Sequence, residues 1–337
     1  MTEAHEVLPP FSPLSVSIGI YVYQDRRMAD PVERLDEMVD MARTAEQLGF
    51  DGVTASEHHR GRSGYMPNPL QLMSMYLHET ERTWAAGCPM LLPLRVPGTL
   101  AEELAWLNAR FPDRVGMTFA AGADNEDFAA LGVPFESRAA AYEKGLRLVS
   151  DVLSGRNRGA LGGDPAIARC AGHPIPLSSG SMTRTGVRRA ARCGVGVTFG
   201  RRQWQPANAA GTGGDPVREL LELYASAGGR GPKVYTTYVF VGRPPEGVAE
   251  GIAERNVLGP AAAGLKTRVI EQPPRLGGTV DEIVEDWLDA LAAGMDCVNM
   301  RIPYHGMPLS IAREQLLRIG EEVLPAFRKA VAGRPPS

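Results

Sequence analysis

The chain has 337 residues, of which 44% are hydrophobic and 22% charged, and its formal net charge at pH 7 is −3. A chain of this length can bury a large core, and a charge this close to neutral, without a run of Lys and Arg, gives no reason to expect nucleic acid or an anionic membrane as a partner. Residues 1–13 are polar and proline-rich, and no apolar stretch approaches the ~20 residues that cross a bilayer, so we expect a cytoplasmic protein without a secretory signal.

Short runs rich in β-branched residues recur along nearly the whole chain, and amphipathic segments separate them. The predicted strands cover residues 15–23, 52–56, 83–92, 115–121, 174–179, 194–199, 234–241 and 297–302. The predicted helices cover residues 35–48, 100–109, 138–153, 183–192, 215–227, 280–293 and 311–330. Strands that alternate with helices pair in parallel through right-handed crossovers, and eight of them close a barrel. We therefore predict an α/β fold in which residues 1–337 form one (β/α)8 TIM-barrel domain with insertions.

An open doubly wound sheet is the alternative fold, but it usually has fewer strands and a glycine fingerprint. Gly194 and Gly196 begin such a fingerprint, yet the third glycine, Gly200, comes one residue late. No acidic residue follows at the required distance, so the barrel is favoured.

Three segments are long and irregular for simple connections between a strand and a helix: 155–173, 201–215 and 242–278. Long barrel insertions often act as lids over the active face, and disordered surface is the alternative. A lid is the preferred interpretation for segment 242–278.

The four cysteines, Cys88, Cys170, Cys193 and Cys297, are scattered and form no Cys-x-x-Cys pair. This spacing indicates neither a disulfide framework nor a zinc site. We expect four free thiols in a reducing compartment.

A polar triplet, Glu57-His58-His59, follows the second predicted strand. In a barrel, the carboxyl ends of all strands meet at one face, and catalytic groups lie there. Two imidazoles and a carboxylate can perform acid–base chemistry near neutral pH, and a purely structural hydrogen-bonding role is the alternative. A metal site is not expected, because neighbouring histidines on an extended chain point to opposite sides and no His-Glu-x-x-His spacing occurs.

Several short motifs occur together, in order, over nearly the whole chain. They are Glu57-His58-His59, Pro67-Asn68-Pro69, the stretch 91–97, Ala101-Glu102-Glu103, Arg114-Val115-Gly116, Asp127-Phe128, Gly132-Val133-Pro134, Arg138, the stretches 176–183 and 294–303, and Leu324-Pro325. In this order the chain resembles the luciferase-like flavin monooxygenases. The resemblance implies an insertion-bearing barrel that uses reduced flavin mononucleotide (FMN) and molecular oxygen, forms a homodimer, and receives reduced flavin from a separate reductase.

The resemblance also implies roles for particular residues. His58 matches the catalytic acid/base of luciferases and His59 a supporting residue, with Glu57 beside them. Cys88 and Pro89 match a cis peptide against the flavin ring, and a cis bond is far less costly before proline than elsewhere, so we predict a cis Cys88–Pro89 bond. A trans proline at a strand bulge is the alternative. Where luciferases carry a cysteine near the flavin and an arginine that pairs with its phosphate, this chain has Ala120 and Ala121.

The flavin phosphate is expected where the fifth strand runs into the following helix, because free N–H groups at a helix N-terminus and nearby hydroxyls bind anions. An ordinary helix cap is compatible with this role. The expected cofactor-binding residues here are Ser179, Gly180, Ser181, Thr183 and Arg184.

Aromatic and polar residues at other strand ends suggest a pocket for a planar or amphipathic organic substrate. The candidates are Tyr21, Tyr23, Tyr235, Tyr238, Arg301, Tyr304 and His305.

The expected function is that of a two-component monooxygenase, which uses reduced FMN and oxygen to oxygenate a small organic substrate. A deazaflavin-dependent oxidoreductase on the same barrel is one alternative. A non-catalytic flavin-binding protein is the other.

Overall fold

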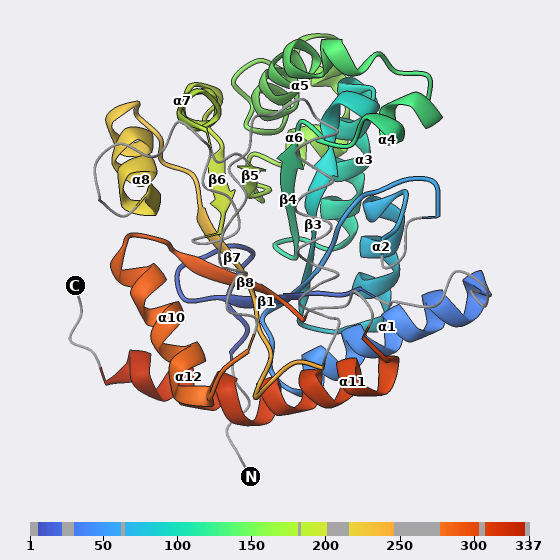
Figure 1. The fold of residues 1–337 in the computed structure, drawn as a ribbon. Helices are drawn as coiled ribbons and strands as arrows, with labels where there is room; N and C mark the ends of the chain where they lie inside the picture. The colour runs from blue at the N-terminus through green and yellow to red at the C-terminus, as the bar shows by residue number, and fades with distance from the viewer. Residues whose placement is uncertain are drawn as a thin grey trace.

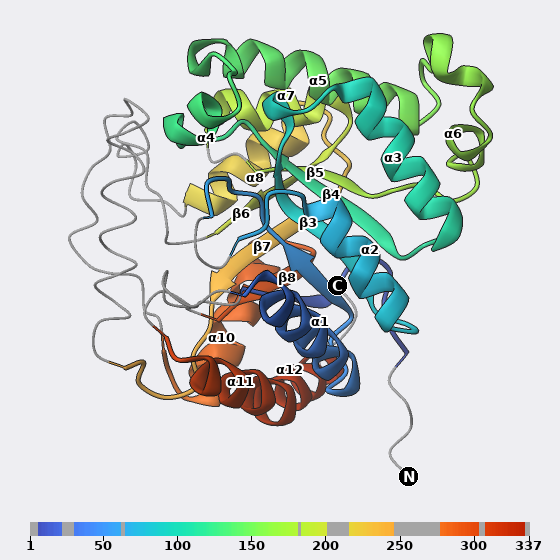
Figure 2. The same ribbon diagram turned by 90° about the vertical axis from the view of Figure 1, so that its right-hand side faces the viewer.

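The computed structural model describes residues 6–21, 30–61, 65–180, 183–200, 216–245, 277–302 and 307–333. Within them, eight parallel strands form a closed barrel in which each strand pairs with its sequence neighbours and β8 returns to β1 (Figures 1 and 2). The strands are β1 (Val16–Gly19), β2 (Gly52–Ala55), β3 (Trp84–Leu91), β4 (Val115–Ala120), β5 (Leu177–Gly180), β6 (Gly196–Phe199), β7 (Lys233–Tyr238) and β8 (Cys297–Arg301). Every predicted strand overlaps an observed one, so the predicted barrel is confirmed.

The helices surround the barrel (Figure 1). They are α1 (Pro31–Gln47), α2 (Pro69–Glu79), α3 (Pro97–Arg110), α4 (Asn125–Ala130), α5 (Arg138–Leu153), α6 (Pro165–Arg169), α7 (Arg184–Cys193), α8 (Pro216–Ser226), α10 (Val280–Ala292), α11 (Leu309–Arg318) and α12 (Leu324–Ala332). Short 3₁₀ turns lie at η1 (Leu92–Leu94), η2 (Phe135–Ser137) and η3 (Gly159–Gly163). In the part of the chain that the structure describes, no helix combines the length and apolarity that spanning a membrane requires.

The helices differ from the sequence prediction in two ways. Helices α2, α4 and α6 were not predicted. Pro69 stands at the start of α2, whose apolar residues Leu72, Met73 and Tyr76 are buried. The single helix predicted over residues 311–330 is interrupted by a π turn, Ile319–Val323. Pro325, in the first turn of α12, has no backbone N–H for a regular helical bond, which accounts for the break in the pattern.

Residues 155–173 do not form a lid over the carboxyl ends of the strands. They connect the end of α5 to the start of β5, and such connections lie at the amino end of a barrel. Within them, Asp164 accepts a hydrogen bond from Trp106 Nε1 of α3 at 3.1 Å, and the His173 carbonyl accepts one from Asn108 Nδ2 at 2.8 Å. The other two lid candidates, 201–215 and nearly all of 242–278, lie outside the described residues.

The amino end of the barrel is closed by an apolar plug. The Phe11 ring meets the Trp84 ring edge to face, with centroids 5.2 Å apart, and Val234 and Cys297 pack against them. Gly52 allows this packing, because a Cβ there would lie 2.2 Å from the Trp84 ring. The amino end is thus sealed, and any ligand must enter from the carboxyl ends of the strands.

The middle of the barrel is polar, whereas TIM barrels are usually filled by branched apolar side chains. On one side, the Ser178 hydroxyl bonds to the hydroxyls of Thr118 and Thr198 at 2.6 and 2.7 Å. On the other, Asn299 Nδ2 donates to the hydroxyls of Ser17 and Thr54, both at 2.9 Å. Polar side chains from six strands therefore form a layer inside the barrel, directly below its open carboxyl end.

Candidate active site

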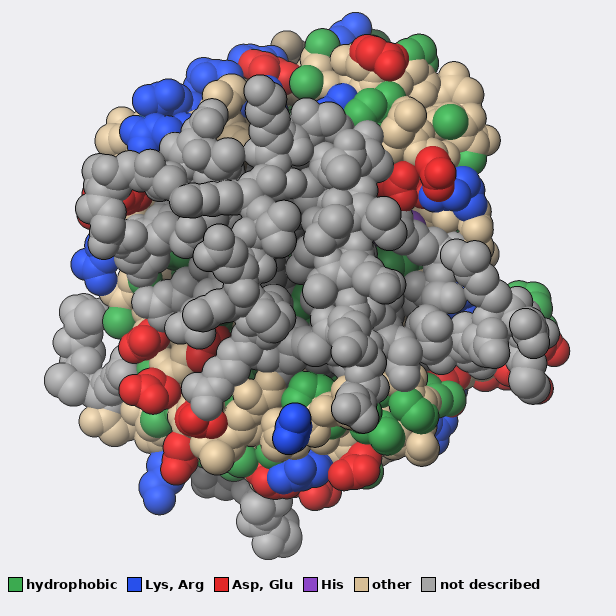
Figure 3. Space-filling view, viewed as in Figure 1, with side chains coloured by type: hydrophobic (Ala, Val, Ile, Leu, Met, Phe, Trp, Pro, Cys, Tyr) green, Lys and Arg blue, Asp and Glu red, His purple; other side chains and the backbone are tan. Residues whose placement is uncertain are grey.

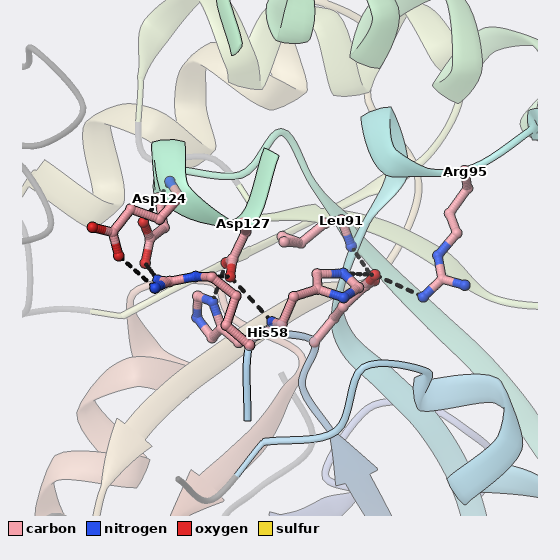
Figure 4. A network of polar contacts seen from close by, with 9 residues as sticks. His58, Leu91, Arg95, Asp124 and Asp127 are labelled. Carbon is pink, nitrogen blue, oxygen red and sulfur yellow. Dashed lines mark hydrogen bonds and ion pairs between the residues drawn. The ribbon is translucent and has the colours of Figure 1, made fainter. Parts of the chain in front are cut away.

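His58 lies directly beyond the carboxyl end of β2, and a buried carboxylate orients its ring. Asp127 Oδ2 is 2.6 Å from His58 Nδ1, and Asp127 Oδ1 accepts a hydrogen bond from the His59 backbone N–H at 3.1 Å (Figure 4). The Asp127 side chain is fully buried, while the His58 side chain is 18% exposed. The pair resembles the base-and-orienter arrangement of catalytic histidines.

Asp127 is a candidate site residue that the sequence analysis missed. It matched a family motif, but no role was assigned to it. It stands in the first turn of α4, and Asp124 caps this helix by accepting from the Glu126 N–H at 3.0 Å. Its position in the helix that follows β4 is a signal that the sequence offered, because that helix starts near the carboxyl end of the strand. The sequence could not reveal its partner, His58, which lies 69 residues earlier in the chain.

Glu57 and His59 point away from His58 and form a separate structural cluster. Glu57 Oε1 lies 3.0 Å from His59 Nε2 and accepts a hydrogen bond from Arg95 Nη2 at 2.6 Å. Its Oε2 accepts from the Leu91 N–H at 2.8 Å (Figure 4). The Glu57 carboxylate is buried and paired with a guanidinium, so these contacts tie β2 to the end of β3.

An aromatic wall links His58 to the mouth of the barrel. The His58 ring meets the Tyr65 ring at a centroid distance of 4.3 Å, and Tyr65 meets Tyr21 at 5.4 Å. Tyr238, at the end of β7, packs against the two tyrosines. Tyr21 and Tyr238 therefore lie where the sequence analysis expected pocket residues, whereas Tyr65 was not predicted.

Tyr235 does not belong to this pocket, and its assignment there was wrong. It is 2% exposed and donates a hydrogen bond at 2.8 Å to Asp286 of α10, outside the barrel. Side chains alternate along a strand, so Thr236 and Tyr238 face inward and Tyr235 faces the helices. Tyr23, Tyr304 and His305 lie outside the described residues.

The Cys88–Pro89 peptide bond is cis, as predicted, and lies where the pairing of β3 with β4 shifts its register. The Cys88 carbonyl accepts hydrogen bonds from the Ser56 hydroxyl and from Arg301 Nη2. The thiol is fully buried, and burial raises its pKa. Cys88 is thus a neutral inward-facing residue near the mouth.

The expected phosphate-binding residues divide into two groups. Thr183 caps α7 by accepting from the Gly186 N–H at 3.0 Å, and Arg184 is exposed at the first turn of the same helix. Ser179 is not available to a cofactor, since its side chain is buried on the outer face of β5, 2.6 Å from the Tyr142 hydroxyl. Ser181 lies outside the described residues.

Small residues surround this end of β5. A Cβ added to Gly180 would lie 3.8 Å from the Ala120 Cβ, so the two positions are neighbours. Ala120 and Ala121 are both partly exposed. Basic side chains gather over α7 at the upper left of Figure 3, and the exposed arginines of that helix are Arg184, Arg188 and Arg192.

Ligand atoms of His58, Asp124 and Asp127 lie within 4.8 Å of one another, a spacing compatible with a metal ion. However, the Arg60 guanidinium lies 3.5 Å from Asp124 and 3.9 Å from Asp127. This cation already supplies the positive charge that a metal would bring to these carboxylates.

Comparison with known proteins identifies the family. A family model for luciferase-like monooxygenases matches residues 16–295. The alkanal monooxygenase alpha chain of Photorhabdus luminescens is 26% identical over 117 residues, which are 35% of this chain and 32% of that relative. The F420-dependent glucose-6-phosphate dehydrogenase of Tsukamurella paurometabola is 30% identical over 127 residues, 35% of this chain and 38% of that protein. The chain thus matches about a third of the length of these curated relatives.

Among solved structures, the fold is similar to the oxygenating constituent of 3,6-diketocamphane monooxygenase from Pseudomonas putida, determined in complex with FMN. The TM-score is 0.67 at 16% identity, over 93% of this chain and 98% of the other. At this identity the likeness concerns the fold alone. The family model covers most of the barrel, and this chain belongs to the luciferase-like monooxygenase family.

Proposed function

We propose that the protein is a monooxygenase that uses reduced FMN and molecular oxygen to oxygenate a small organic substrate. The observation that carries the proposal is the His58–Asp127 pair, 2.6 Å apart, at the carboxyl rim of the barrel and in contact with an aromatic wall. We further propose that it works as a cytoplasmic homodimer and receives its reduced flavin from a separate reductase.

The residues at the rim are compatible with a flavin. The first N–H groups of α7 have no partner within the helix and can bind a phosphate, with the exposed Arg184 beside them. Ala120 and Gly180 carry little or no side chain, so a flat ring can approach β4 and β5. When bound, reduced flavin supplies the two electrons that activate oxygen.

His58 is the proposed proton carrier. Asp127 holds Nδ1, so Nε2 is the nitrogen that gains and loses a proton, and the carboxylate stabilises the imidazolium when it forms. The aromatic wall of Tyr21, Tyr65 and Tyr238 limits water around this ring. Exclusion of water protects the activated oxygen from loss before it reaches the substrate.

A deazaflavin-dependent hydride transfer is the second candidate. It is favoured by the 30% identity with an F420-dependent dehydrogenase, which is higher than the 26% with the alkanal monooxygenase chain. An imidazole oriented by a carboxylate can serve as acid or base in either reaction.

The two candidates differ in the cofactor bound and in the reaction with oxygen. Anaerobic titration with reduced FMN and reduced F420, followed by admission of oxygen, separates them. We expect reduced FMN to bind more tightly and oxygen to be consumed by the complex. Tighter F420 binding without oxygen uptake would support the second candidate, and binding of neither would contradict both.

A pair of substitutions at Gly180 serves as control. A Cβ there has neighbours at 3.5 to 3.9 Å, which is ordinary contact, so Gly180→Ala should bind flavin nearly as the wild type does. Gly180→Asp adds a negative charge beside the expected phosphate and should weaken binding about tenfold or more.

A further inference from the structure

A cation, Arg301, lies in the mouth of the barrel beside an aromatic ring and the Cys88 carbonyl. Arg301 is the last residue of β8, and its side chain alternates inward with those of Cys297 and Asn299. Its Nη2 donates to the Cys88 carbonyl at 3.0 Å, and its guanidinium carbon is 5.6 Å from the centroid of the Tyr21 ring. Gly19 leaves room for it, since a Cβ there would lie 3.2 Å from Arg301 Cγ.

Arg301 has no carboxylate partner among the described residues. The ionisable side chains around it are those of Tyr21, Cys88, Tyr238 and Tyr65, and none of them is a carboxylate. By contrast, Arg95, also near the rim, pairs with Glu57 at 2.6 Å. A largely buried cation without a counter-ion is costly, because it loses hydration that no negative charge replaces.

Several buried polar atoms in and near Arg301 also lack hydrogen-bond partners. Arg301 Nε is buried and has no hydrogen-bond partner. One layer below, Thr236 Oγ1 and Asn299 Oδ1 are likewise buried without partners, although nearly all buried polar atoms in proteins have one. On the β7–β8 side, the mouth of the barrel therefore offers a ligand the positive charge and N–H of Arg301, the hydroxyl of Thr236 and the acceptor oxygen of Asn299.

We infer that Arg301 binds a negatively charged group of the substrate, so that the substrate is a planar organic anion such as a carboxylate or an ionised phenol. This inference rests on the proposed function. The charged group forms a charge-assisted hydrogen bond with the guanidinium, and the flat body of the substrate packs against Tyr21, Tyr65 and Tyr238.

The reduced flavin ring is a second possible source of negative charge. The expected phosphate site at β5 and α7 lies across the barrel from β8 and β1, which favours the substrate as the partner of Arg301. The test must nevertheless separate the two sources.

The test uses the full chain and two matched probes, benzoate and benzamide, which have similar shapes and differ in charge. Calorimetry without flavin measures their binding at concentrations up to about 10 mM, where so small a ligand is expected to bind. We expect the wild type to bind benzoate and not benzamide. Arg301→Gln should weaken benzoate binding about tenfold or more, Arg301→Lys should weaken it less, and Arg147→Gln, on the exposed face of α5, should not change it.

Three results would overturn the inference: no benzoate binding to the wild type, equal binding of benzamide, or unchanged benzoate binding in the folded Arg301→Gln protein. A fourth result would also overturn it and assign Arg301 to the cofactor: in a parallel titration, Arg301→Gln weakens the binding of reduced FMN but leaves the binding of benzoate unchanged. Failure of the proposed function is a different result, because the protein would then bind neither flavin nor F420. The benzoate titration is done without flavin, so it can still be interpreted in that case.

Discussion

At the scale of single residues, the buried carboxylate of Asp127 makes two hydrogen bonds that position the candidate site. Asp127 accepts from His58 Nδ1 through one oxygen and from the His59 backbone N–H through the other. It therefore holds both the ring and the chain that carries it. A hydrogen bond from a histidine to a carboxylate sets the tautomer of the ring, and loss of such a partner typically lowers activity tenfold to a hundredfold.

If Asp127 acts through His58, the two substitutions should not be additive. We expect His58→Ala to lower kcat about a hundredfold or more, and Asp127→Asn about tenfold to a hundredfold, with flavin affinity nearly unchanged. In the His58→Ala background, Asp127→Asn should add little. Steady-state kinetics of the four proteins measures this coupling.

A second aspartate–histidine pair provides the matched control. Asp113 lies 3.0 Å from His173, and the Asp113 side chain is exposed while that of His173 is partly exposed. Asp113→Asn should leave kcat unchanged. If Asp127→Asn lowers kcat by the same factor with and without His58, Asp127 does not act through the imidazole.

At the scale of elements, the positions of the helices around the barrel depend on their capping residues and on the apolar faces through which they pack. Helix α10 begins with a capping box, in which Thr279 Oγ1 accepts from the Glu282 N–H at 3.3 Å and Glu282 Oε2 accepts from the Thr279 N–H at 2.9 Å. Its buried Trp287 meets Phe327 of α12 with ring centroids 5.3 Å apart. The cap fixes where α10 starts and hence how its apolar face meets α12.

Loss of this cap should be measurable as loss of stability. We expect Thr279→Ala to lower the free energy of unfolding by about 1 kcal/mol, because the Glu282 N–H loses its side-chain acceptor. Thr185→Ala, in the exposed first turn of α7, should not destabilise the protein. Urea unfolding of both variants tests this, and an equal effect in the two would show that the capping box contributes nothing specific.

At the scale of the whole molecule, the barrel buries acidic groups that remain neutral. Burial raises the pKa of all four thiols, Cys88, Cys170, Cys193 and Cys297. Burial likewise raises the pKa of the phenols of Tyr21 and Tyr142. In the unfolded chain these groups have their ordinary pKa values. At alkaline pH the unfolded chain therefore releases protons that the folded protein keeps, so the free energy of unfolding depends on pH.

The sign of the pH dependence follows from these directions. Each folded-state pKa is raised above the unfolded value, so the stabilisation is complete below the ordinary thiol pKa of about 8.5 and is lost as the pH rises above it. We expect the urea midpoint, measured with reductant present, to be lower at pH 9.5 than at pH 8. A constant midpoint over this range would contradict the assignment of the thiols as buried and neutral.

The sequence by itself determined the barrel and the end of it at which the candidate site lies. Hydrophobic period and glycine stops are local properties, so the eight strands and most helices could be predicted from them, and His58 could be assigned to the rim because it follows β2. Helices α2, α4 and α6 and the π turn before Pro325 were missed, because several local patterns fit those segments equally well.

Only the tertiary structure decided which side chains meet. Both faces of a barrel strand are buried, so composition did not reveal that Ser179 and Tyr235 face the outer helices while Tyr238 faces the mouth. Asp127 and His58 come together because β2 and the helix after β4 both end at one rim, although 69 residues separate them in the chain. Alternation along a strand is a local rule, but its phase is set by closure of the whole barrel.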